Sequence, residues 1–96
     1  MITVSVEYYS IFCAAAGFCR REALQLESGR TLWDLVNIID EKYGQCFWIK
    51  VLDHDNKLRI TAWVLVNGKK VNLPGFNEKL NNGDKILFST PLLVGG

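Results

Sequence analysis

The sequence has few of the residues that most often do chemistry in proteins. It contains one histidine, His54, and three cysteines, and Cys13, Cys19 and Cys46 follow neither a CxxC nor a zinc-ribbon spacing. An iron–sulfur site would require a fourth cysteine in a tighter cluster. There is no glycine-rich phosphate loop, GxSxG elbow or HExxH motif. We therefore expect no metal site and none of the usual catalytic constellations, with His54 in an exposed loop and the cysteines as half-buried free thiols.

The sequence also lacks an excess of charge of either sign and any long apolar run. Eleven basic and ten acidic residues give a net charge of +1, whereas nucleic-acid-binding proteins concentrate Lys and Arg against phosphates. No apolar run approaches the roughly 20 residues that span a bilayer. The first ten residues lack the basic n-region of a secretory signal. Because free cysteines suit a reducing compartment, we expect a cytoplasmic protein that binds neither nucleic acid nor membrane.

The chain does contain enough apolar material for one core. Hydrophobic residues make up 49% and aromatic residues 11% of its 96 residues, which excludes a disordered chain. A chain of this length folds as one domain and has little room for a deep active site. Any chemistry is therefore expected to be unusual, or to be done by a partner.

The clearest local signal is an amphipathic helix. Four apolar residues recur at helical spacing within 32–39. Thr31 and Asp34 have the spacing of a capping box at its start, and Gly44 can adopt the left-handed conformation that ends a helix. The pattern predicts a helix from 32 to 43.

Strand patterns surround this helix. Period-two alternation or β-branched residues predict strands at 2–8, 23–27, 59–66, 69–71 and 85–89. The segment 59–66 is apolar on both faces, which predicts a central position in the sheet. Asn67-Gly68 predicts a type I′ hairpin, and Lys69-Lys70 is more typical of a solvated edge strand than of a partner site.

The segments between the strands and the helix are shorter and less regular. Residues 13–17 are predicted to be a connector, Pro74-Gly75 a turn, and 47–49 has no clear period. The order of elements predicts an α+β fold in which one mixed sheet of four to five strands packs on one main helix.

The C-terminal segment follows the last predicted strand. Pro91 cannot donate to a strand ladder, so the sheet should end before it. Residues 91–96 could extend roughly 20 Å, at about 3.3 Å each. They end in Gly95-Gly96, whose backbone can enter a channel too narrow for any Cβ. We predict a domain at 1–90 and an extended, flexible tail at 91–96, with an incidental frayed end as the alternative.

Several segments together resemble the MoaD/ThiS family of sulfur carriers. These are Tyr8-Tyr9 after the first strand, Thr31-Leu32-x-Asp34-Leu35, Val64–Gly68, Leu80–Phe88, Pro91 and Gly95-Gly96. The resemblance covers nearly the whole chain. It implies a ubiquitin-like β-grasp fold, in agreement with the element order above.

The resemblance also implies a chemistry. In this family an E1-like adenylyltransferase of the MoeB/ThiF type uses ATP and magnesium to adenylate the terminal glycine, and a persulfide or sulfide then leaves a thiocarboxylate. Gly96 would carry the sulfur, Gly95 would permit passage into the partner, and Leu92, Leu93 and Val94 would line the partner's channel. The chain would be a carrier that binds no cofactor itself, not an enzyme. In the MoaD branch it would be the small, sulfur-donating subunit of a molybdopterin synthase, and the precursor would be bound by a large subunit of the MoaE type.

The resemblance implies a partner interface at Tyr9 and Phe88, with packing in the sheet as the alternative for Tyr9. Lys70, and Ser89 or Thr90, stand where the family has apolar interface residues. Cys13-Ala14 stands where many members have Arg-Glu.

Three other functions remain open. The chain could be a ubiquitin-like modifier joined to lysines through Gly96. It could be a carrier for thiamine thiazole synthesis or another sulfur acceptor. It could also be a plain β-grasp interaction module whose two glycines are incidental.

Overall fold

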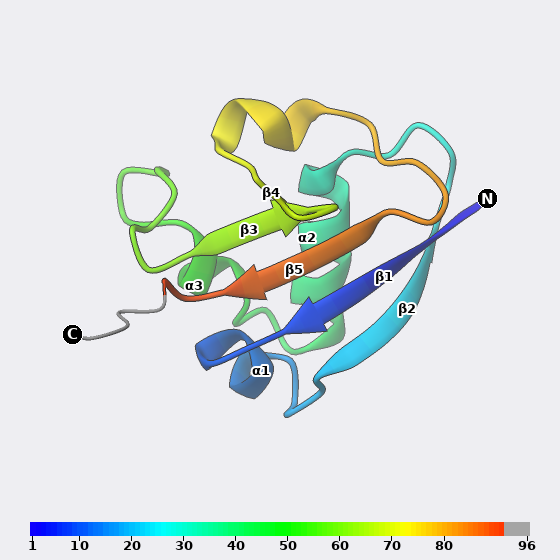
Figure 1. Ribbon diagram of the computed structural model, residues 1–96. Coiled ribbons are helices and arrows are strands. Elements are labelled where there is room, and N and C mark those ends of the chain that lie inside the picture. The colour runs from blue at the N-terminus through cyan, green and yellow to red at the C-terminus, as the bar shows by residue number, and fades with distance from the viewer. Residues whose placement is uncertain (92–96) are drawn as a thin grey trace.

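One mixed sheet packs against one main helix (Figure 1). The computed structural model describes residues 1–91 of the chain. The strands are β1 (Ile2–Tyr8), β2 (Arg21–Leu26), β3 (Trp63–Val66), β4 (Lys69–Lys70) and β5 (Lys85–Ser89), in the spatial order β2-β1-β5-β3-β4. The central pair, β1 and β5, is parallel, and the other neighbours are antiparallel. The predicted α+β fold, a β-grasp with a mixed sheet, is confirmed with five strands.

The main helix, α2 (Leu32–Lys42), begins where its cap predicts. The Thr31 N–H donates to Asp34 Oδ2 at 2.9 Å, and the Asp34 N–H donates to Thr31 Oγ1 at 3.4 Å. Each bond satisfies a backbone donor that the first helical turn leaves free. The helix ends one residue before the predicted position, and Gly44 follows with a φ of +80°. Its buried stripe is Leu32, Leu35, Val36 and Ile39.

Aromatic rings form the part of the core nearest the end of the sheet. Tyr8 stacks on Phe88 with ring centroids 6.0 Å apart, and Phe47 meets Phe88 edge to face at 5.1 Å. Phe12 packs on both Phe47 and Phe88. Burying one such side chain stabilises a fold by about 1.5–3 kcal/mol. This cluster fixes where β1 and β5 end together.

Two short helices contribute to this core. The sequence predicted a connector at 13–17, but the chain forms α1 (Ile11–Ala15), which buries Phe12. The unassigned segment near Phe47 forms α3 (Trp48–Val51). Helices of four or five residues are not stable alone. Burial of their apolar side chains in the core therefore stabilises α1 and α3.

The other differences from prediction concern element boundaries. β2 begins two residues earlier than predicted, β4 stops before Val71, and the predicted Pro74-Gly75 turn belongs to a 3₁₀ helix, η1 (Leu73–Asn77). β3 begins at Trp63, four residues later than predicted, and lies inside the sheet between β5 and β4. The predicted position within the sheet is therefore confirmed.

The resemblance motifs around the turns hold the sheet together. Asn67 and Gly68 have φ values of 53° and 84°, as a type I′ hairpin requires. Asn67 Nδ2 donates to Asp84 Oδ1 at 2.9 Å, and the Lys85 N–H donates to Asn67 Oδ1 at the same distance. The Asn81 N–H donates to Asp84 Oδ2 at 2.8 Å. These polar residues join the β3–β4 turn to the turn before β5.

Candidate functional site

Residues 1–91 contain no cluster of three His, Cys, Asp or Glu side chains that could hold a metal ion. The three cysteines are half-buried free thiols, as predicted, and His54 lies exposed in the loop between α3 and β3. No helix in this part of the chain is long and apolar enough to cross a membrane. The site is built instead from the sheet and from the point where the tail leaves it.

The sheet has one covered face and one open face. α2 lies behind the sheet in Figure 1. Its buried stripe belongs to the same core cluster as Val4, Val6, Val64, Ile86 and Phe88. Because successive side chains of a strand point to opposite faces, the residues between them point toward the viewer. The open face therefore carries Ser5 and Glu7 from β1, Leu87 and Ser89 from β5, and Trp63 and Leu65 from β3.

An apolar hollow of about 330 Å³ lies at one end of this open face. Its lining residues are Tyr9, Trp63, Leu65, Leu87, Ser89 and Thr90. Tyr9 is 48% exposed and Trp63 is 38% exposed, so both rings present area to solvent. The Lys70 ammonium lies 4.8 Å from the centroid of the Trp63 ring, a cation–π contact at the rim. Apolar area rimmed by polar groups is typical of a protein-docking surface.

The tail begins at the edge of this apolar hollow. The Tyr9 N–H donates to Phe88 O at 2.9 Å, and Thr90 Oγ1 donates to Ser10 Oγ at 3.1 Å. Ser10 has a φ of 55° and a ψ of −130°, a conformation that L residues adopt sparsely. Together these contacts fix the position of Thr90, from which the chain continues to Pro91.

The residues predicted to act in the tail lie outside the described residues. They are Leu92, Leu93, Val94, Gly95 and Gly96. What the structure does place is the segment before them, which lines the apolar hollow.

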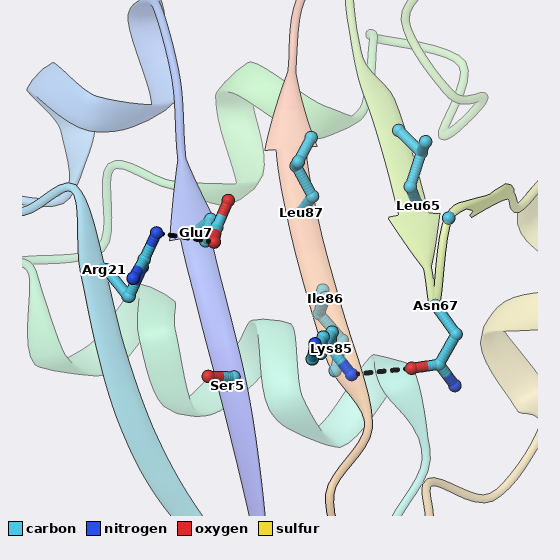
Figure 2. Close-up of a pocket in the computed structure, with 9 residues that line it drawn as sticks. Ser5, Glu7, Arg21, Leu65, Asn67, Lys85, Ile86 and Leu87 are labelled. Carbon is cyan, nitrogen blue, oxygen red and sulfur yellow. Dashed lines mark hydrogen bonds and ion pairs between the residues drawn. The ribbon is translucent and has the colours of Figure 1, made fainter.

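A second, polar hollow of about 410 Å³ continues along the same face (Figure 2). Glu7 Oε1 and Arg21 Nη2 form an ion pair at 3.1 Å on one side, and Asn67 and Lys85 lie on the other. Tyr9 Oη donates to Glu7 Oε2 at 2.9 Å, which raises the pKa of the Tyr9 phenol. Glu7 thus holds Tyr9 at one hollow and Arg21 at the other, so the two hollows form one continuous surface.

The two predicted interface residues have different positions. Tyr9 lies on the open face, where it lines the apolar hollow. Phe88 is fully buried and packs in the aromatic core, so it offers no surface to a partner. The physical reason is the period of two in β5, which directs Phe88 inward and its neighbours Leu87 and Ser89 outward. Phe88 is therefore a core residue, and the predicted interface role does not hold for it.

The sequence did not predict three of the residues that line the apolar hollow, namely Trp63, Leu65 and Leu87. The signal that could have found them was the segment 59–66, which is apolar on both faces. In a chain with one main helix, only one sheet face is covered. Outward apolar residues of this strand then lie on an open face that a partner can reach.

A carboxylate network supports this end of the molecule from beneath. Tyr8 Oη and Tyr43 Oη each donate to Glu22 Oε2 at 2.7 Å, and Lys42 Nζ donates to Glu22 Oε1. Partial burial alone would raise the pKa of Glu22, but the bonds from Lys42, Tyr8 and Tyr43 outweigh burial and lower it. Burial, followed by the bond to Glu22, raises the pKa of Tyr8 far above its ordinary value. Glu22 is thus an ionised anchor between β1, β2 and α2.

Comparison with known proteins gives matches among solved structures alone. No protein-family model and no curated protein matches the chain. The putative molybdopterin converting factor subunit 1 from Pyrococcus furiosus superposes with a TM-score of 0.74 at 26% identity, covering 96% of this chain and 100% of that one.

Two further structural neighbours are Urm1 and a small archaeal modifier protein. Urm1 from Trypanosoma brucei superposes with a TM-score of 0.71 at 24% identity, covering 94% of this chain and 93% of that one. The small archaeal modifier protein 1 from Methanosarcina acetivorans gives 0.73 at 22% identity, with coverage of 97% and 96%. The structural neighbours of the chain are thus ubiquitin-like proteins of the MoaD, SAMP and Urm1 type over nearly its full length. The resemblance found in the sequence is confirmed at this level.

Proposed function

We propose that this chain is a sulfur carrier whose C-terminal Gly96 is adenylated by an E1-like enzyme and converted to a thiocarboxylate. The observation that carries the proposal is the position of Ser89 and Thr90, the two residues before the tail, which we call the tail root. Ser89 and Thr90 line the apolar hollow, and the Leu-Leu-Val-Gly-Gly segment follows one residue later. A partner bound to the hollow would therefore have the reactive end of the carrier within its reach.

The chemistry requires little of the carrier itself. A carboxylate oxygen of Gly96 would attack the α-phosphorus of ATP, with pyrophosphate as the leaving group. Sulfide would then attack the acyl carbon and displace AMP. A persulfide would do the same, and a thiol would afterwards cleave the S–S bond and leave the thiocarboxylate. ATP and magnesium belong to the activating partner in this scheme, which fits the lack of a phosphate loop in the sequence.

Gly95 would allow the tail to enter a narrow channel of the partner. A glycine has no Cβ, so two successive glycines let the backbone enter a narrow channel. Leu92, Leu93 and Val94 would supply apolar contacts along that channel. The division into a domain at 1–90 and a tail at 91–96 belongs to the same proposal.

The open face would be the docking surface for the activating enzyme. Exposed aromatic and leucine side chains in the hollow supply apolar contact area, and aromatic residues are enriched at such interfaces. The adjoining Glu7–Arg21 pair and Lys85 would orient the partner through charge. Tyr9 has both an apolar ring and a hydroxyl in this surface.

The acceptor that we favour is the molybdopterin precursor. The support is the name of the Pyrococcus furiosus neighbour, a converting factor subunit, and the MoaD-like features of the sequence. On this proposal a second, larger subunit of the MoaE type binds the precursor and receives the tail. The chain then acts as the sulfur-donating subunit and not as an enzyme by itself.

A second candidate function is supported by the modifier neighbours. A neighbour named as a small archaeal modifier protein superposes over 97% of this chain. In a modifier, the same adenylated Gly96 would form an amide bond with a lysine of another protein. The two candidates share activation and differ in the nucleophile that attacks the acyl carbon.

Intact-mass analysis separates the candidates. The full-length protein is incubated with an E1-like adenylyltransferase of its source organism, ATP, magnesium and a sulfur donor. A gain equal to the difference between one sulfur and one oxygen atom, located at Gly96, supports the carrier. A lysine-linked conjugate supports the modifier. If neither product forms, and removal of Gly95 and Gly96 leaves partner binding unchanged, both chemical proposals are wrong.

A further inference from the structure

The second surface of interest is the free edge of β2, on the far side of the molecule from β4 (Figure 1). The Tyr8 N–H donates to Arg20 O at 2.9 Å, so this pair is hydrogen-bonded across the ladder. In an antiparallel pair, bonded and non-bonded positions alternate. Arg21, Ala23 and Gln25 therefore direct their backbone N–H and C=O groups away from β1. No strand of residues 1–91 pairs with that side.

The two edges of the sheet differ in how well they resist pairing. β4 has two residues, both lysines, and short charged edges resist pairing with other chains. β2 has six residues, and its outward positions after Arg21 are the uncharged Ala23 and Gln25. It contains no proline or lysine. β2 thus has none of the features that protect an edge at the place where a partner strand would add.

A groove of about 480 Å³ lies beneath this edge, between β2 and α2. Its apolar part includes the buried Leu26 and the side chain of Ile38, which is 37% exposed. A strand added to β2 would direct alternate side chains into this groove. The surface therefore offers both main-chain pairing and a place for an apolar side chain.

The charged residues of the groove indicate which partner it fits. Three carboxylates, Glu27, Asp34 and Glu41, line the groove together with two cationic groups, the Arg30 guanidinium and the amino group of Met1. Arg30 Nη2 lies 3.6 Å from Glu27, and Arg30 Nη1 lies 3.9 Å from Asp34. Glu41 forms no ion pair with any described residue. The groove is acidic on balance, so it favours basic side chains.

We propose that the β2 edge and the groove beneath it bind an extended basic segment of a partner protein by strand addition, with an apolar side chain of that segment against Ile38 and lysines or arginines facing Glu41 and Glu27. This surface lies apart from the apolar hollow and the tail root. It meets the open face at Arg21, which lines the polar hollow.

The test uses a synthetic probe on the full-length protein. Acetyl-Lys-Thr-Ile-Thr-Ile-Thr-Lys-amide places its lysines and isoleucines on one side of a strand. It is titrated into ¹⁵N-labelled protein, and amide chemical shifts are followed by NMR. We expect saturable shifts centred on Ala23 and Gln25, with further shifts at Ile38 and Glu41.

Two variants and two peptides serve as controls. Glu41→Lys should weaken the peptide about tenfold or more, and Asp55→Lys, an equal charge change in a distant exposed loop, should not. Replacing the central threonine of the peptide with proline removes a main-chain donor, and replacing its lysines with glutamates reverses its charge. Either change should abolish the shifts.

Three results would overturn the proposal. The first is no shift at millimolar peptide, or shifts that centre on another surface. The second is equal binding of the proline peptide, because it would exclude strand addition. The third is a concentration-dependent dimer with its interface at Ala23 and Gln25, because a second copy would then occupy the edge.

Discussion

At the scale of single residues, the chemistry of this chain is concentrated in a few polar side chains that are held by hydrogen bonds. Glu22 is the clearest case, since it accepts bonds from two tyrosines and a lysine beneath the end of the sheet. Tyr8, one of these donors, also stacks on Phe88 in the core. The position of the tail root therefore depends on an ionised carboxylate that is partly shielded from water.

Replacing Glu22 with Gln should lower the free energy of unfolding at neutral pH by about 1–3 kcal/mol, because the tyrosines and Lys42 lose a charged acceptor. The pKa of Glu22 is lower in the folded than in the unfolded protein. Its stabilisation is therefore present above the unfolded pKa of about 4.3 and is lost as pH falls through the folded value. The measurement is denaturant unfolding at neutral and acidic pH.

The control for Glu22→Gln is Glu27→Gln, which changes an exposed carboxylate of the β2–α2 loop. It should change the free energy of unfolding by less than about 0.5 kcal/mol. A gap between wild type and Glu22→Gln that stays constant down to acidic pH would contradict the ionised anchor.

Gly75 is the second residue whose replacement has a defined cost. A Cβ built on Gly75 would lie 2.5 Å from Cγ1 of Val71, a stiff β-branched side chain. Gly75→Ala should therefore destabilise the protein by about 1–3 kcal/mol. Thermal and denaturant unfolding of Gly75→Ala, Val71→Ala and the double variant measure the effect. If the clash is the cause, the double variant costs less than the sum of the two single changes.

At the scale of elements, polar turn residues connect strands that are far apart in sequence. Asn67 and Asp84 join the β3–β4 turn to the start of β5. This contact fixes the register of β3 against β5, and that register in turn places Leu65 opposite Leu87 on the open face. The turn motif of the sequence thus acts on the candidate site indirectly.

A double-mutant cycle on Asn67→Ala and Asp84→Ala tests this connection. Each single change should cost about 1–3 kcal/mol, because the Asn67 turn conformation or the two hydrogen bonds accepted by the Asp84 carboxylate are lost. The coupling energy between them should be about 0.5–3 kcal/mol, as expected for residues in one network. Additive effects would show that the two turns are held independently.

Elements with local signals could be predicted from the sequence, and elements decided by tertiary burial could not. α2 has its own cap, apolar stripe and terminal glycine, and β1 alternates strictly between apolar and polar residues. α1 and α3 have no such signals, and they exist because Phe12 and Phe47 are buried together. The position of Phe88 in the core follows from the register of β5, which the sequence alone does not reveal.

The sequence predicted where the candidate site lies but only some of the residues that line it. The terminal glycines, Tyr9 and the carrier resemblance pointed to the end of the sheet. Trp63, Leu65 and Leu87 were missed because the sequence does not show which sheet face α2 covers. Only the arrangement in space distinguishes outward leucines of an open face from those of a buried strand.

At the scale of the whole molecule, the domain has two candidate binding surfaces. The open face adjoins the tail root at the end of the middle strand, β5, and the β2 edge is one outer edge of the sheet. A single small domain can therefore hold one partner at the site of chemistry and another elsewhere. The proposed activation depends on the first surface alone.

The most direct test of the central claim is the activation of the tail through the open face. ATP–pyrophosphate exchange by the E1-like enzyme is measured with wild type, Leu87→Lys in the apolar hollow, and Thr3→Lys at the far end of the same face. Both variants are first checked for folding by NMR. We expect Leu87→Lys to lower kcat/KM by about tenfold or more and Thr3→Lys to leave it unchanged. A folded Leu87→Lys variant that supports exchange at the wild-type rate would contradict the account.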